Sequence, residues 1–357
     1  MEVRSLNLTN YRNFAKLNLK FSPEGALISG KNGIGKTNLL EAISYCAFGK
    51  SIRNRSDSEL IKFSEAFFRL TGNFVIHNTP IEFEASFDGA NKNIKMDGTK
   101  ITKISELYLL LKVVYFSPND IEIAQGAPSV RRNFIDLAIS QQNYNYLLLL
   151  KEYQQILKQR NALLKTEFNK DEKRTWDKRF IHKGAKIIET RIDYLRSFSK
   201  LLTENYNFIS GENEVVNAEY VCSAPLNPHD SLKDRLTDHL DTIETQENHA
   251  QRSLFGPHLD DILFKINEKS FRYFGSQGQK RSLVISAGLA QAKMIDAVSS
   301  EFPVLIFDDV LSELDENRTK NIIELLSTTH QIFIATPNAS QYSFIDLPTI
   351  NMENLSN

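Results

Sequence analysis

Cysteine is nearly absent from this chain: Cys46 and Cys222 are the only two among 357 residues. They lie far apart and outside any CxxC pattern, which argues against a disulfide scaffold and a zinc ribbon. Two buried thiols in a reducing compartment are expected. No apolar run approaches the ~18 residues that a membrane span requires, and residues 1–10 alternate as in a strand and not as in a secretory signal. The sequence therefore predicts a soluble, cytoplasmic protein without a membrane partner.

The chain also lacks an excess of either charge, since 43 lysines and arginines face 44 acids and the net charge is −1. The protein is not a polycation, so any nucleic-acid binding has to come from a local patch. A length of 357 residues is long for one compact core, and we expect two lobes or one domain with a large insertion.

What the chain does contain is a glycine loop between a short apolar run, 26–29, and a segment of helical composition, 38–48. The loop matches the phosphate-binding pattern GxxxxGK(S/T), and its residues are Gly30, Lys31, Asn32, Gly33, Ile34, Gly35, Lys36 and Thr37. Glycines let backbone N–H groups close around phosphate oxygens, and the following helix adds its positive dipole end. Lys36 is expected to reach the β and γ phosphates of ATP, and Thr37 to bind Mg²⁺. The alternative is a chance match, which the flanking strand and helix disfavour.

An apolar strand that ends in two carboxylates supplies a partner for this metal. Residues 304–307 form a continuous apolar run, as in a parallel strand covered on both faces. Asp308 would hold Mg²⁺ through its water shell, and Asp309 stands where a general base or water-positioning residue belongs. Lys36, Asp308 and Asp309 are therefore the candidate catalytic residues. A solvated acidic turn is the alternative.

A second candidate anion site is the segment 275–279, which precedes a helical stretch at 280–298. A small hydroxyl residue, Ser276, and a glycine, Gly278, at a helix N-terminus can bind an anion. One chain does not need two phosphate sites for one nucleotide, whereas two chains that face each other do. An ordinary turn with an N-cap is the alternative.

Strand patterns occupy both terminal parts of the chain, at 1–10, 81–87, 113–116, 262–266, 304–307 and 332–335, and Asp97–Gly98 signals a hairpin turn. In the middle, apolar residues recur at helical spacing over 146–157 and 180–201, with a polar turn expected at 169–175. We therefore expect an α/β fold, a mixed sheet with helices, built from residues 1–120 and 246–357, with a helical lobe of residues 121–245 inserted.

Residues 151–200 contain 14 lysines and arginines against 7 acids, and Arg131 and Arg132 lie upstream. Such a patch could neutralise DNA phosphates, although a solvated helical face is the alternative. No base-reading motif is evident, which favours recognition of the DNA backbone or shape. His258 could contact a nucleotide or cap a turn, and the sequence leaves both open.

These motifs together resemble the ABC-type ATPase heads of the SMC class, and within that class the RecF family of bacterial DNA replication and repair proteins. The resemblance covers nearly the whole chain and rests on the loop 30–37 and on the following blocks: 10–14, 116–120, 131–136, 256–261, 275–279 and 307–315. It implies an ATPase head with a helical lobe and no long coiled coil. It also implies Mg²⁺-dependent, DNA-stimulated and slow ATP hydrolysis, and a head-to-head dimer that ATP forms on single-stranded, gapped or double-stranded DNA.

The resemblance further implies work with RecO and RecR in loading a recombinase. It adds Arg12 and Asp315 to the nucleotide-binding residues, and it lets Ser276, Gly278 and Gln279 close the nucleotide site of a second copy. The general ABC pattern has a glutamate where this chain has Asp309, and it has a switch histidine where Thr336 is the candidate here. His330 is expected at the surface. The Q-loop position is open between Gln125 and the segment 117–120. A transporter ATPase subunit and a small-molecule kinase are the competing functions.

Overall fold

A computed structural model of the chain describes all residues except 54, 167–168, 226–230, 327–330 and 356–357. The chain divides into two compact units, the first of residues 1–120, 208–211 and 284–357 and the second of residues 121–207 and 212–283. The sequence-based division placed 246–283 with the terminal parts. In the structure these residues belong to the second unit, because strand β10 (Asp261–Ile266) pairs with β9 (Val216–Val221).

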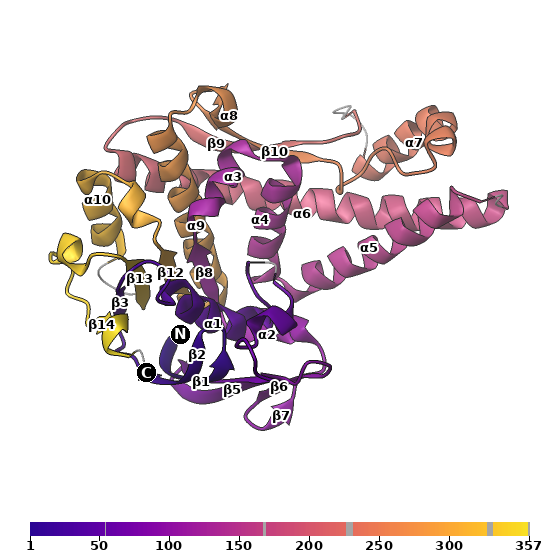
Figure 1. The fold of residues 1–357 in the computed structure, drawn as a ribbon. Coiled ribbons are helices and arrows are strands. Elements are labelled where there is room, and N and C mark those ends of the chain that lie inside the picture. The colour runs from indigo at the N-terminus through magenta and orange to yellow at the C-terminus, as the bar shows by residue number, and fades with distance from the viewer. Residues whose placement is uncertain (54, 167–168, 226–230, 327–330, 356–357) are drawn as a thin grey trace. The chain divides into compact units, whose positions relative to one another are not determined.

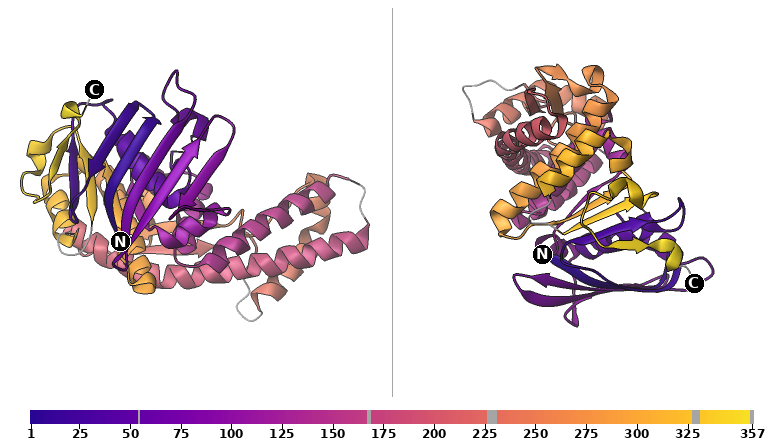
Figure 2. Two further views of the ribbon diagram at one scale, coloured as in Figure 1. Left: turned by 90° about the horizontal axis from the view of Figure 1, so that it is seen from below. Right: turned by 90° about the vertical axis from the view of Figure 1, so that its left-hand side faces the viewer.

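The first unit contains two sheets (Figures 1 and 2). A five-stranded parallel sheet has the order β14-β3-β13-β12-β8, with β3 at Gly25–Ser29, β8 at Val113–Phe116, β12 at Val304–Asp308, β13 at Ile332–Thr336 and β14 at Thr349–Asn351. A six-stranded antiparallel sheet has the order β2-β1-β4-β5-β6-β7, with β1 at Glu2–Tyr11, β2 at Phe14–Lys20, β4 at Phe68–Ile76, β5 at Thr79–Phe87, β6 at Lys92–Met96 and β7 at Thr99–Lys100. The left view of Figure 2 shows these six strands side by side.

Helix α1 (Lys36–Phe48) lies between the two sheets, in contact with β8, β12 and β13 of one and with β4 and β5 of the other. Eleven of its thirteen residues are buried, which explains why the segment has apolar residues on all sides and no polar stripe. The opposite face of the parallel sheet packs against α9 (Gln277–Ser299) and α10 (Glu316–Leu326) through residues such as Ile285, Leu289 and Ile322. A short helix, α2 (Leu107–Leu110), precedes β8.

The second unit is mainly helical. Its helices are α3 (Glu122–Gln125), α4 (Pro128–Ser140), α5 (Tyr144–Leu163), α6 (Lys170–Ser210, whose last residues join the first unit), α7 (Leu232–Ala250) and α8 (Phe271–Phe274), and α9 begins in it. β11 (Lys269–Ser270), β10 and β9 form a small antiparallel sheet. Tyr153 of α5 stacks on Phe180 of α6 with ring centroids 5.5 Å apart, so the apolar stripes expected in these two helices do meet.

The predicted strands and the α/β class are confirmed, with parallel and antiparallel strands in separate sheets. Asp97 and Gly98 form the β6–β7 turn with φ +49° and +74°. The turn predicted at 169–175 is wrong beyond Asn169, because α6 begins at Lys170. The Asn169 side chain accepts the N–H of Asp171 at 2.9 Å, and acids in the first turn favour the helix start.

Both cysteines are free thiols, Cys46 buried and Cys222 partly exposed. Among the residues that the structure describes, no helix is both long enough and apolar enough to cross a bilayer.

Candidate nucleotide-binding site

The glycine loop leaves the carboxyl end of β3 and leads into α1. Because β3, β13 and β12 are parallel neighbours, the loops that follow them emerge at the same edge of the sheet. Gly35 is the N-cap of α1 in a left-handed conformation, φ +115°, and the first-turn N–H groups of α1 are directed out of this end. The local geometry is that of a phosphate site.

Asn13, in the turn between β1 and β2, supports the loop from outside. Its Nδ2 donates to the Ile34 carbonyl at 2.8 Å, and its Oδ1 accepts from Asn38 Nδ2 at 2.8 Å. The positive φ favours glycine at position 35, and a Cβ there would lie 2.6 Å from the Asn13 amide nitrogen, so a larger residue would displace the Asn13 side chain. Because the Ile34 carbonyl oxygen accepts this hydrogen bond from Asn13, its partial negative charge is kept away from a bound phosphate.

Replacing Asn13 by alanine is expected to raise the KM for ATP roughly five- to tenfold and to leave kcat nearly unchanged. The lost contact is a hydrogen bond worth about 1 kcal/mol, and it orders the binding loop instead of touching the reacting atoms. Steady-state ATPase kinetics would check this, with Asn18→Ala, an exposed asparagine of β2, as the control. A lower melting temperature with an unchanged KM would contradict the positioning role.

Lys36 is 3% exposed, and its ammonium is held inside the loop. Nζ donates to the carbonyl oxygens of Gly30 at 2.8 Å and Lys31 at 3.3 Å. These partners lie on the inner side of the loop, so phosphate oxygens can replace them without a large movement of the side chain. By contrast the Lys31 side chain is 85% exposed and lies 3.8 Å from Glu353.

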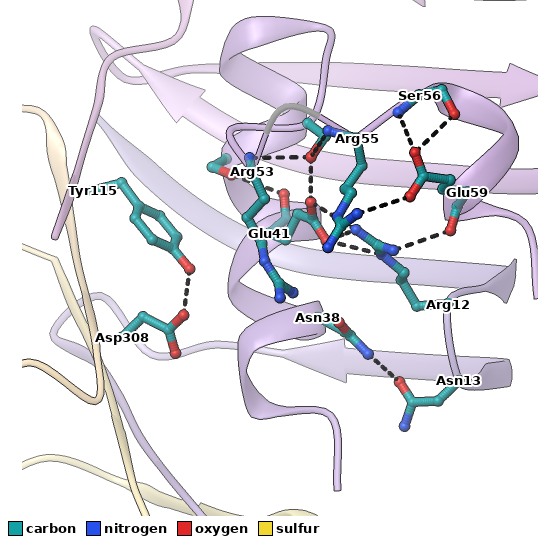
Figure 3. A network of polar contacts seen from close by, with 12 residues as sticks. Arg12, Asn13, Asn38, Glu41, Arg53, Arg55, Ser56, Glu59, Tyr115 and Asp308 are labelled. Carbon is teal, nitrogen blue, oxygen red and sulfur yellow. Dashed lines mark hydrogen bonds and ion pairs between the residues drawn. The ribbon is translucent and has the colours of Figure 1, made fainter. Parts of the chain in front are cut away.

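Asp308 ends β12 beside Thr37. Its carboxylate accepts from Thr37 Oγ1 at 2.9 Å. It also accepts from the Tyr115 hydroxyl at 2.7 Å (Figure 3). Burial raises the pKa of Asp308, while the bonds from Tyr115 and Thr37 and the charge of Arg53 oppose this. The structure therefore brings together the two residues that the sequence predicted as metal ligands.

Asp309 follows in a left-handed conformation, φ +55°, and its Oδ1 is buried without a hydrogen-bond partner among the described residues. An orphaned carboxylate oxygen on the residue that follows Asp308 fits a site that takes Mg²⁺ and its water shell. Thr37 and Asp308 would hold the ion, and Asp309 would bind a water. Mg²⁺ supplies charge neutralisation on the phosphates when it is bound.

Glu41 of α1 is fully buried, and the sequence reasoning missed it. It accepts from Arg12 Nε at 3.0 Å and Nη2 at 2.8 Å, and from the Ser51 hydroxyl (Figure 3). Arg12, predicted to contact nucleotide, is thus paired with the loop helix in this structure, and its nucleotide contact stays a prediction. A lone acid among apolar helix residues was the available signal, because a buried charge requires a partner.

Tyr115 and Arg53 are two further residues of the site without a sequence signal. Tyr115 is the β8 residue whose hydroxyl holds Asp308, and burial raises the pKa of this phenol, with the charge of Asp308 adding to the effect. Arg53 is exposed and close enough to act electrostatically on Asp308 (Figure 3). A positive charge near the metal-binding carboxylate can also attract a phosphate.

Ser276 lies in the second unit at the start of α9. Its N–H donates to Gln279 Oε1 at 2.9 Å, and its hydroxyl accepts the Gln279 N–H at 3.2 Å, a reciprocal capping box. Ser276 is exposed and Gly278 partly so. The N-cap interpretation is therefore correct, and the exposure of Ser276 keeps the helix N-terminus accessible to an anion.

The remaining predicted residues have other local roles in this structure. Asp315 caps α10 by accepting the Arg318 N–H at 2.9 Å. Thr336 is fully buried at the end of β13, and its hydroxyl accepts the Asn338 N–H at 3.2 Å. Gln125 lies in α3 near Glu122. His330 is outside the described residues. The nucleotide role of Asp315 and the switch role of Thr336 stay predictions.

His258 lies in the second unit, with Nδ1 at 2.8 Å from the Tyr153 hydroxyl. Burial lowers its pKa to about 4, so the ring is neutral at pH 7. Below pH 6.5 the unfolded chain binds a proton that the folded chain does not bind until about pH 4. Stability is therefore expected to fall across this window, by roughly 2 kcal/mol from this group.

Replacing His258 by glutamine is expected to reduce that loss of stability between pH 6.5 and 4. Urea unfolding at several pH values would measure it, with His249→Gln in α7 as the control. An unchanged pH dependence would show that His258 does not set the acid sensitivity.

The basic stretch 151–200 is less available than its composition suggested. Arg160, Lys173 and Arg191 are buried in ion pairs: Arg160 with Asp177 at 2.7 Å and Glu247, Lys173 with Asp177 at 3.0 Å and Glu244 at 2.7 Å, and Arg191 with Asp136 at 2.8 Å. Arg131, 3% exposed, pairs with Asp261 at 2.8 Å. The blocks 131–136 and 256–261 therefore meet in the interior of the second unit, and Arg131 is not on a DNA-facing surface.

The chain matches the family described as RecF/RecN/SMC N terminal domain over residues 2–348. The DNA replication and repair protein RecF of Streptococcus agalactiae is 33% identical over 345 residues, which cover 96% of this chain and 93% of the relative. A solved structure of the recombination mediator protein RecF with ATP in the RecFOR pathway has a TM-score of 0.87 at 33% identity, covering 94% of this chain and 92% of that chain. An SMC head bound to the C-winged helix domain of ScpA, 16% identical, has a TM-score of 0.55 over 97% of this chain and 92% of that one, and shows the fold alone.

The glycine loop at the edge of a parallel sheet, the acidic end of β12 and the capped start of α9 define an ABC-type ATPase head of the SMC class. Within this class, the chain is similar to RecF proteins over nearly its full length. The chain belongs to the RecF family of DNA replication and repair proteins.

Proposed function

We propose that this protein is an ATP-dependent DNA-binding switch of recombinational repair and replication-fork maintenance. ATP joins two copies head to head on DNA, and slow hydrolysis releases them. The observation that carries the proposal is the presence of two candidate phosphate-binding elements in one chain. One is the loop before α1 in the first unit, and the other is the exposed, capped N-terminus of α9 in the second.

In the proposed site, one copy supplies the loop 30–37, with Lys36 on the phosphates and Thr37 and Asp308 on Mg²⁺. The second copy supplies Ser276, Gly278 and Gln279 to the γ-phosphate. Arg12 and Asp315 complete the nucleotide-binding set. The buried, unpartnered Oδ1 of Asp309 supports a role in holding the attacking water. An aspartate is one methylene shorter than glutamate and holds water less well, which is consistent with slow hydrolysis.

DNA is the proposed macromolecular ligand, in single-stranded, gapped or double-stranded form, with RecO and RecR as protein partners. Family membership supports this, and so does the solved relative described within the RecFOR pathway. The exposed lysines and arginines of α6, among them Arg174, Lys178, Arg179 and Lys186, are the candidate phosphate contacts. The buried and paired residues of the basic stretch, Arg160, Lys173 and Arg191, are not among these candidates.

Two measurements test the proposal. Light scattering with a non-hydrolysable ATP analogue and Mg²⁺ should show a dimer, and without nucleotide a monomer. Binding to single-stranded, double-stranded and gapped DNA at several salt concentrations should be stronger with ATP and should weaken steeply as salt rises. A monomer under both conditions, or equal DNA binding with and without ATP, would contradict the proposed switch.

A further inference from the structure

The short helix α8, directly before Ser276, presents two neighbouring aromatic side chains to solvent. Tyr273 is 75% exposed and Phe274 65% exposed. The helix itself is anchored, because Phe271 is fully buried and packs edge-on against Tyr206 with ring centroids 5.9 Å apart. Two large rings held outward on a fixed support are the kind of surface that a partner covers.

Two cations accompany these rings. The Arg272 guanidinium lies 5.5 Å from the Tyr273 ring centroid, and the Lys269 ammonium lies 5.7 Å from that of Phe274. Both are exposed, and within the described part of the chain no carboxylate pairs with either. Lys269, Arg272, Tyr273 and Phe274 are called the α8 platform below. A depression of about 200 Å³ opens beside it, lined in part by Arg272 and Tyr273.

The α8 platform is continuous with the capped start of α9. Only Gly275 separates Phe274 from Ser276, and its N–H donates to the Phe271 carbonyl at 3.1 Å. A Cβ at Gly275 would lie 2.9 Å from the Phe271 ring, so this link is close-packed and the platform has a fixed position next to Ser276.

We propose that the α8 platform is a contact surface for a second copy of this chain in its nucleotide-bound form. The inference rests on the proposed ATP-dependent dimer and names a part of its interface outside the phosphate contacts. In the proposed dimer, the triphosphate of the second copy brings negative charge to the α9 N-terminus. This charge complements the two unpaired cations, and the rings supply apolar area beside them.

Stacking of single-stranded DNA bases is the other use of an aromatic and cationic surface. The structure favours protein contact, because one face of each ring is already covered by the protein's own cation.

The test compares the double variant Tyr273→Ala/Phe274→Ala with the wild-type chain. With a non-hydrolysable ATP analogue and Mg²⁺, sedimentation velocity over a concentration series should show a dimer dissociation constant raised about tenfold or more. Affinity of the monomer for a fluorescent ATP analogue should not change, because the loop 30–37 lies in the other unit. Arg272→Glu should weaken the dimer in the same direction. Phe63→Ala, at a ring 93% exposed in the first unit, is the matched control and should leave the dimer unchanged.

The outcomes separate the two proposals. A wild-type chain that stays monomeric with the analogue overturns both. A wild-type dimer that the double variant and Arg272→Glu match in stability overturns this inference alone. A double variant that dimerises normally but loses binding to a fluorescent single-stranded oligonucleotide assigns the α8 platform to DNA, and the inference fails.

Discussion

Replacing Lys36 by alanine should lower the affinity for ATP by ~100-fold or more, about 2.7 kcal/mol. The ammonium of Lys36 is the buried cation of the glycine loop and bonds to the carbonyl oxygens of Gly30 and Lys31. Its loss removes the charge that neutralises the β and γ phosphates and leaves these carbonyls facing the ligand. Titration with a fluorescent ATP analogue would measure the change.

Lys31→Ala provides the matched control for this variant. Lys31 belongs to the same loop, but its side chain is 85% exposed and its distance to Glu353 is 3.8 Å, so its removal should change affinity by less than about threefold. Equal losses in the two variants would mean that general loop charge, and not the buried ammonium, binds the phosphates. Wild-type affinity for ATP in Lys36→Ala would show that the glycine loop does not bind the nucleotide.

Replacing Ser276 by arginine should leave nucleotide binding intact and abolish the ATP-dependent dimer. The glycine loop lies in the first unit and Ser276 in the second, so the variant's own loop is not altered. The long cationic side chain would fill the space at the α9 N-terminus that the γ-phosphate of the second copy is proposed to occupy. Light scattering with the non-hydrolysable analogue, beside a titration of nucleotide, reports both properties.

Ser231→Arg separates this effect from the loss of a helix cap. Ser231 is also an N-cap in the second unit, for α7, and its side chain accepts the Asp234 N–H. Either substitution should cost about 1 kcal/mol of stability, but only Ser276→Arg should prevent dimerisation. Normal dimerisation of Ser276→Arg would mean that the α9 N-terminus is not part of the interface.

The parts of the fold that were predictable are those that neighbouring residues determine. The glycines at fixed spacing, the apolar run into Asp308 and the Asp97–Gly98 turn each carry their signal within a few residues. Thr37 and Asp308, each predicted as a ligand of Mg²⁺, lie within hydrogen-bond distance, because parallel strands bring their carboxyl ends to one edge.

The parts that were not predictable depend on contacts between distant residues. Arg131 and Arg191 read as surface charge in sequence, yet each is buried against an acid, Asp261 and Asp136 respectively. Nothing local marks them, because an internal ion pair has the composition of an exposed one. The same holds for Asn13, whose contact with the glycine loop joins segments that are 21 residues apart.

The burial of α1 between two sheets has a consequence for amide hydrogen exchange. A helix with eleven of thirteen residues buried and neighbours on two sides has no route to open locally, so its amides should exchange only when the whole unit unfolds. Without nucleotide, exchange in α1 would report the global free energy of unfolding, and nucleotide would raise that free energy by RT ln(1 + [L]/Kd). Exchange in α1 measured without and with nucleotide would therefore give fold stability and ligand affinity, while Gly33 and Ile34 would also be slowed by direct contact with the ligand.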